Sequence, residues 1–131
     1  MSVESFDPSR DTIVLEGAVL AELLRAAGRL DEPMFGLDRL AVARLAPAVR
    51  QGRADWEAAA RGLDNAGIEA LIRLFTLGEK LPGWESGANS PVVPLAVELK
   101  ARNAYPKDLT RWIRSNSDNR YLPHGNLLDR L

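Results

Sequence analysis

The sequence predicts an all-α protein: a single compact domain, residues 1–131, of five to seven short helices in an orthogonal array or in stacked hairpins like those of an α-solenoid. Its 131 residues suit one domain that buries a core without disulfides or metal ions. Leu and Ala are abundant while aromatic residues make up only 6%, which favours packed helices over a β-sandwich. Apolar residues recur at helical spacing, and no segment of any length alternates as a strand does.

The N-terminal part predicts one helix after a lead-in. Residues 1–10 are rich in turn formers, and we expect them to be loosely ordered. Apolar residues then share one face of a helix over residues 17–27, which Gly28 ends. Residues 12–16 fit either the start of this helix or a short extended segment, because they include β-branched residues. The apolar face consists of Val19, Leu20, Leu23, Leu24 and Ala27.

Two helices are expected between Leu37 and Leu63. The first lies in LDRLAVARLAPAVRQG and ends at Gly52. Pro47 cannot donate a backbone hydrogen bond, so a kink or a restart is expected there. The second lies in DWEAAARGL, with Trp56 on its inward side. The residues expected to face inward from the first helix are Leu37, Leu40, Ala41, Leu45, Ala48 and Val49.

The segment DNAGIEALIRLFTLGEKL, residues 64–81, gives the strongest helix signal in the chain. Its apolar residues cover most of the helical circumference, and its polar residues form one narrow stripe. A helix with so thin a polar face is expected at the centre of the fold, in contact with neighbours on several sides. The stripe consists of Glu69, Arg73, Thr76 and Lys80.

Three further helices are expected after the loop of residues 82–91. Ser90 followed by Pro91 is a helix start signal, because a serine caps free N–H groups and proline suits the first helical position. The break AYP separates this helix from an amphipathic one over residues 107–116. A last short helix, NLLDRL, is expected to be capped by Asn126.

Composition and motifs exclude several chemistries. The chain has no cysteine and one histidine, which rules out thiol chemistry and the usual zinc sites. It has no phosphate-binding glycine motif, and GWESG has the wrong spacing for a nucleophile elbow. Neither a signal peptide nor an apolar run of transmembrane length is present. We therefore expect a cytoplasmic, bacterial-type protein without a cofactor, a metal or a membrane contact.

The stretch SNSDNRYLPHGN, residues 115–126, gathers polar and aromatic residues around the single histidine. Most of them suit turns and helix ends, because Asn, Asp and Ser side chains bond the local backbone while Pro and Gly shape turns. Tyr121 and Leu122 are expected to attach the tail to the core. Arg120 and His124 have no structural role in this interpretation, and we expect them to border an interaction surface.

The predicted function is a non-enzymatic protein-interaction or regulatory module that binds a protein partner, with a homodimer left open. The net charge of -1 gives no global attraction to nucleic acid. Lys107, Arg111 and Arg114 nevertheless share a helical face, so a nucleic-acid-binding regulator is the first alternative. An enzyme that uses His124 as acid or base is the second. The expected surface consists of Trp84, Arg102, Lys107, Arg111, Arg114, Arg120, Tyr121 and His124.

Overall fold

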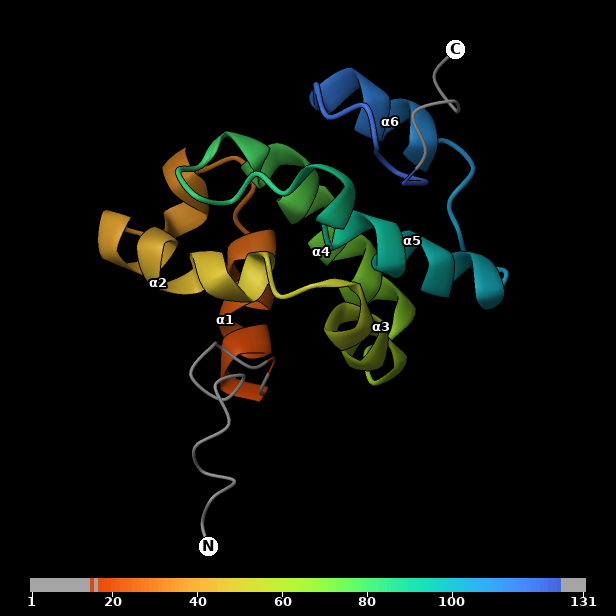
Figure 1. The fold of residues 1–131 in the computed structure, drawn as a ribbon, viewed down its shortest axis with the longest axis horizontal. Helices are drawn as coiled ribbons and strands as arrows, with labels where there is room; N and C mark the ends of the chain where they lie inside the picture. Colours follow the sequence, from red (N-terminus) through yellow and green to blue (C-terminus); the bar gives the residue numbers. More distant parts are fainter. Residues whose placement is uncertain (1–14, 16, 126–131) are drawn as a thin grey trace, which may run out of the picture.

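The computed structural model describes residues 15 and 17–125, and this part of the chain is helical, without strands. Its six α-helices run in several directions within one compact domain (Figure 1). They are α1 (Gly17–Ala27), α2 (Arg39–Val49), α3 (Arg53–Arg61), α4 (Asn65–Leu77), α5 (Val92–Ala101) and α6 (Leu109–Asn116). Short 3-10 helices are η3 (Pro33–Gly36), η4 (Gly78–Lys80) and η5 (Gly87–Asn89). The predicted fold class is confirmed.

Several expected elements lie outside the described residues. They are the lead-in over residues 1–10, all of residues 12–16 except Leu15, and the last helix from Asn126 onward. Within the part that the structure describes, no helix is long and apolar enough to cross a membrane.

Capping residues determine where two of the helices begin. The side chain of Asp38 accepts a hydrogen bond from Ala41 N at 2.8 Å, and that of Asp64 accepts one from Gly67 N at 2.8 Å. Each cap satisfies an N–H group that the first helical turn leaves free. Accordingly, α2 and α4 each begin at the residue after the aspartate.

Proline is tolerated within or beside two helices. α2 runs through Pro47 to Val49, so the restart considered for that position does not occur. α5 begins directly after Pro91. The hydroxyl of Ser90 accepts a hydrogen bond from Val92 N at 3.2 Å. Pro91, predicted as the first helical residue, is the N-cap, so the helix begins one residue later than predicted.

α4 lies at the centre of the fold, as its thin polar stripe predicts (Figure 1). It packs against α1, α5 and α6. Thr76 of the polar stripe is itself buried, and its hydroxyl donates to Ile72 O at 2.7 Å. Arg73 pairs with Glu69 at 2.8 Å and lies 4.7 Å from the ring centre of Trp112 on α6. Even the polar side of α4 therefore contacts a neighbouring helix.

A row of three aromatic rings forms the middle of the core. Phe75 of α4 lies between Trp56 and Trp84, with centroid distances of 5.1 and 6.2 Å. Both buried indole N–H groups donate to backbone carbonyls of α2. Trp56 donates to Ala48 O at 3.0 Å. Trp84 donates to Val42 O at 2.9 Å. Rings from α3 and from the loop after α4 thus hold α2 at two points.

The connector between α1 and α2 is a tight, strained reversal. Met34 and Phe35 have φ angles of 50° and 58°, a left-handed conformation that side chains disfavour, and Gly36 follows at 77°. Tertiary packing holds this conformation, because the Phe35 side chain is buried in the core. Met34 is left half-buried at the molecular surface.

Replacing Gly78 by alanine should destabilise the fold, because a Cβ there would lie 2.8 Å from Cε3 of Trp84. The backbone at Gly78 is right-handed helical, with φ at -75°, so the loss reflects the displaced ring. We expect the free energy of unfolding to fall by about 1–3 kcal/mol in urea denaturation. Gly62→Ala is the matched control, since a Cβ at Gly62 comes no closer than 3.7 Å to its neighbours. A Gly78→Ala variant as stable as this control would contradict the tight packing.

Candidate interaction surface

The outer side of α2 carries an exposed apolar stripe. Leu40, Ala43 and Pro47 are all exposed and lie on one side of the helix. Leu40 is 80% exposed, the largest value for a large hydrophobic side chain in the described part of the chain. The expectation that Leu40 faces inward is therefore wrong. At about 100° per residue it lies roughly 155° from the centre of the buried side of α2.

A mostly apolar groove of about 500 Å³ lies along one side of this stripe. Arg39, Val42 and Ala43 line it from α2. Met34 of η3 and Pro82 from the loop after η4 complete it. Its volume falls in the range of about 300–1,000 Å³ that is typical of ligand pockets.

Arginines flank the stripe on both sides. Residues 39–54 contain four arginines and no carboxylate. Arg39 and Arg50 lie on the groove side and form no ion pair with a described residue. On the other side, Arg44 donates to both carboxylate oxygens of Glu22 on α1, at 2.9 and 2.7 Å. We call the stripe, the groove, Arg39, Arg44 and Arg50 the α2 face.

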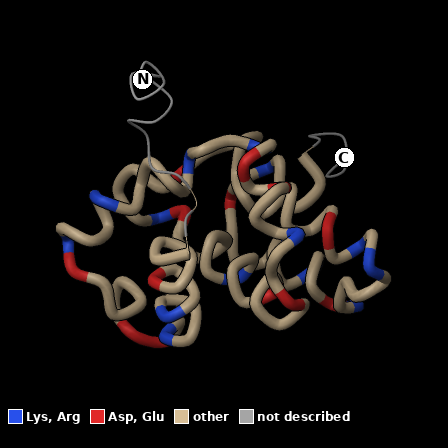
Figure 2. Tube along the Cα trace, turned by 90° about the horizontal axis from the view of Figure 1, so that it is seen from below, with Lys and Arg blue, Asp and Glu red and all other residues tan. Residues whose placement is uncertain are grey.

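The charge effects at the α2 face arise between neighbouring side chains. The hydrogen bonds from Arg44 hold the pKa of Glu22 below its ordinary value. Over the rest of the described chain, charges of both signs are interspersed (Figure 2). The molecule therefore has no dominant pole, and any charge selectivity has to arise from groups close to the binding surface.

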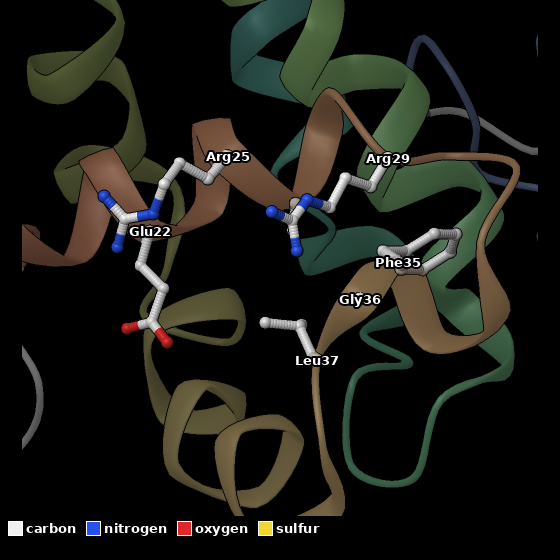
Figure 3. A pocket seen from close by; sticks show the side chains of 7 residues that line it. Glu22, Arg25, Arg29, Phe35, Gly36 and Leu37 are labelled. Carbon is white, nitrogen blue, oxygen red and sulfur yellow. The ribbon is translucent and has the colours of Figure 1, made fainter.

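A second hollow, of about 190 Å³, lies between α1 and the end of η3 (Figure 3). It mixes charges, because Arg25 and Arg29 line it together with Glu22. Glu22 is also the carboxylate that binds Arg44, so this hollow adjoins the α2 face. Its lining residues are Glu22, Arg25, Ala26, Arg29, Phe35, Gly36 and Leu37.

The helix that carries the α2 face is held in place by contacts with other segments. The indole N–H groups of Trp56 and Trp84 bind its carbonyls, and Arg44 binds Glu22 of α1. A surface whose backbone is already held in place loses little conformational freedom when a partner binds. The buried residues of the inner side are Ala41, Val42, Leu45, Ala46, Ala48 and Val49.

Trp84 was expected on the interaction surface, and the structure contradicts this. The side chain is 2% exposed and belongs to the aromatic row of the core. Gly78 allows this position, because any larger residue there would collide with the ring. Trp84 therefore serves the fold and not a binding surface.

Arg102 was also expected on the surface, but its guanidinium joins three helices. Nε donates to Glu98 at 2.8 Å and Nη2 donates to Ala60 O at 3.0 Å. Nη1 donates to Leu63 O at 2.8 Å and to Asn65 Oδ1 at 2.9 Å. The two carbonyls lie at and just beyond the C-terminal end of α3, where a cation is favoured. Ala60 O also accepts from Leu63 N at 3.1 Å, so Arg102 adds a further donor there. The side chain is thus engaged in structure.

The basic residues around α6 lie apart from the α2 face, since α2 and α6 occupy different parts of the molecule (Figure 1). Lys107 and Arg111 are exposed. Arg114 is half-buried and lines a polar hollow of about 190 Å³ between the end of α4 and residues 115–118. These three cations do not contribute to the apolar stripe or its groove.

Asn119 attaches residues 115–125 to the rest of the domain. Its Nδ2 donates to Glu79 Oε2 and to Gly87 O, both at 3.0 Å. Its Oδ1 accepts a hydrogen bond from Tyr121 N at 2.9 Å. Burial raises the pKa of Glu79, although the hydrogen bond from Asn119 acts in the opposite direction. This polar stretch therefore has a structural use in docking the C-terminal part of the described chain.

The remaining residues of this stretch divide between core and surface. Leu122 is buried, as expected, while Tyr121 is half-buried and Arg120 is exposed. His124 is half-buried, and its Nδ1 lies 2.6 Å from Nζ of Lys100. An ammonium group only donates, so the imidazole nitrogen accepts. This contact joins the histidine to a cation.

The α2 face is absent from the surface expected from the sequence, although part of it carries a signal. Leu40 is opposite the buried positions of its own helix, and the surrounding arginines stand in a segment without carboxylates. Met34 and Pro82 carry no such signal, because they come together with α2 only in the folded chain.

Comparisons with known proteins return no match: no family model, no curated protein and no solved structure is similar to the chain. Among the described residues, no group of three or more His, Cys, Asp or Glu side chains comes together to hold a metal ion. The function therefore has to be argued from the chemistry of the surface.

Replacing Arg102 by lysine should destabilise the protein even though the charge is retained. Lysine cannot reproduce the planar fork that serves four acceptors, so Leu63 O and Asn65 Oδ1 lose a donor, while Ala60 O keeps only the backbone N–H of Leu63. We expect the free energy of unfolding to fall by about 1–3 kcal/mol in urea denaturation. Arg53→Lys, in an exposed pair with Glu57, is the control and should change stability by less than about 0.5 kcal/mol. Equal stability of the two variants would contradict the structural role of Arg102.

Replacing Glu79 by glutamine should stabilise the protein near neutral pH. Burial raises the pKa of Glu79 in the folded state above its ordinary value of 4.5. Below about pH 4.5 Glu79 therefore does not reduce the free energy of unfolding, whereas ionisation of Glu79 reduces it as the pH rises through the folded pKa. Glutamine stays neutral and can still accept from Asn119. In urea titrations at several pH values, the advantage of Glu79→Gln over wild type should be smallest below pH 4.5 and then increase. An advantage that does not vary with pH would contradict the raised pKa.

Proposed function

We propose that this protein is a non-enzymatic interaction module that binds a protein partner through the α2 face. The observation that carries the proposal is Leu40, which is 80% exposed next to an apolar groove. Burial of such a side chain against a partner would contribute roughly 1.5–3 kcal/mol to the free energy of binding.

The surroundings of Leu40 resemble the anatomy of protein interfaces. Interfaces place apolar residues at the centre, polar groups at the rim and arginine among the residues that contribute most. The α2 face has Leu40, Ala43 and Pro47 in its middle, with Arg39 and Arg50 at its edge. The groove beside it offers a recess for a large side chain of the partner.

The alternative functions have weaker support. A nucleic-acid site relies on several cations directed at phosphates, and the exposed cations of the surface predicted around α6 are Lys107, Arg111 and Arg120. Electrophoretic shift at two salt concentrations tests it, because phosphate binding weakens steeply with salt. An acid–base enzyme would rely on His124, whose contact is with Lys100.

Replacing Leu40 by glutamate should remove partner binding. A charge at the centre of the stripe cannot be buried against an apolar partner without a large desolvation cost. Wild-type protein and the variant are immobilised, incubated with lysate of the source cells, and the bound proteins are quantified by mass spectrometry. Specific partners should fall about tenfold or more with Leu40→Glu.

Val97→Glu is the matched control, since Val97 is an exposed apolar residue on α5, 46% exposed and away from the α2 face. Circular dichroism and urea denaturation establish that both variants are folded. Retention of the same proteins by Leu40→Glu would show that the α2 face is not the docking surface. An equal loss with Val97→Glu would show that the effect is not specific to α2.

A further inference from the structure

We infer that the partner of the α2 face is an amphipathic helix whose apolar residues are flanked by Asp and Glu. This inference rests on the proposed docking function and adds the chemistry of what docks. Four features of the α2 face carry it: the length of the stripe, the small residue at its middle, the groove, and two arginines, Arg39 and Arg50, that form no ion pair with a described residue.

The stripe has the dimensions of a contact between two helices. From Leu40 to Pro47 it spans two helical turns, or about 10 Å. A partner helix meets such a stripe with side chains at positions i, i+3 or i+4, and i+7. Ala43, between the two larger residues, is small enough for the axes to approach within about 8–10 Å. Addition of a strand is a different mode of peptide binding, and it needs a sheet edge that the described residues do not offer.

The groove supplies a recess for one anchoring side chain. The side chains of Met34, Val42, Ala43 and Pro82, which line it, are apolar. A volume of about 500 Å³ accommodates a leucine or an aromatic ring from the partner. Arg39 lines the same groove, which places a cationic residue beside that anchor.

The charges of the face select an acidic partner. Arg39 and Arg50 form no ion pair with a described residue, and residues 39–54 contain no carboxylate. Arg44 is already held by Glu22 on the far side of the stripe. Carboxylates beside the apolar residues of a partner helix would therefore pair on the groove side, where arginine can bind them through two hydrogen bonds.

Other occupants fit the face less well. In a two-fold dimer the same patch meets itself, and with antiparallel α2 helices Arg39 and Arg50 of one copy lie near Arg50 and Arg39 of the other. With parallel helices they face the Arg44–Glu22 pair of the other copy, whose carboxylate is already occupied. A nucleic acid would pair with the arginines but would leave Leu40 and the groove without apolar contacts. An anionic membrane is usually bound through a longer apolar face than two helical turns.

Selection of peptides on the full chain tests this chemistry. A displayed library of random peptides of about 16 residues, enough for about four helical turns, is panned on the immobilised wild-type protein. Enriched peptides are expected to be net acidic and to carry apolar residues at helical spacing. Their circular dichroism should show helix formation on binding.

Variants then locate the binding site by fluorescence anisotropy of an enriched peptide. Leu40→Glu and the double variant Arg39→Glu with Arg50→Glu should each weaken binding about tenfold or more. Val97→Glu and Arg111→Glu are the matched controls for the apolar and the cationic substitutions, and should stay within about twofold of wild type. Salt at about 0.5 M should weaken binding, because it screens the ion pairs.

The contrary outcomes separate this inference from the proposed function. Enriched peptides that are neutral or basic, yet lose binding with Leu40→Glu, would overturn the acidic helix and leave docking at the α2 face intact. Peptides that are insensitive to Leu40→Glu, or no enrichment at all, would overturn both. Leu40-dependent binding of duplex DNA or phosphatidylserine vesicles, or a Leu40-dependent dimer in sedimentation, would replace the acidic helix by that occupant.

Discussion

Two buried indole N–H groups determine the position of α2, and much of the remaining arrangement depends on them. An indole N–H in the core is costly unless it is hydrogen-bonded. Trp56 and Trp84 both bind carbonyls of α2, with Phe75 between their rings. Because one ring comes from α3 and the other from the loop after α4, these bonds tie two other segments of the chain to α2.

The contacts that hold the inner side of α2 also decide which residues surround its outer side. The bond from Trp84 to α2 brings Pro82, two residues earlier, beside the helix as one wall of the groove. The burial of Phe35 holds the reversal after α1 and leaves Met34 to line the groove as well. Leu40 is then exposed between flanking arginines. The proposed docking surface is thus a consequence of how the core is packed.

Long polar and aromatic side chains do not by themselves indicate a binding surface in this protein. Arg102 satisfies carbonyls at the end of α3, and Asn119 attaches the polar stretch to Glu79 and Gly87. Helix ends and turns leave donors and acceptors that have to be paired when they are removed from water. Polar side chains such as those of Arg102 and Asn119 pair with these donors and acceptors and so have structural roles. The surface expected from residue type therefore differs from the α2 face.

The sequence by itself determined the helical class, the order of the helices, the start of α5 beside Ser90 and Pro91, and the central place of α4. These follow from periodicity and from hydrogen bonds between residues a few positions apart. The exposure of Leu40 could also have been predicted, because helical geometry places it opposite the buried positions of α2. Only the tertiary structure decided that Trp84 is buried, that Arg102 joins three helices, and that Met34 and Pro82 form a groove with α2. Those contacts join residues about 40 positions apart, and no local pattern encodes such a distance.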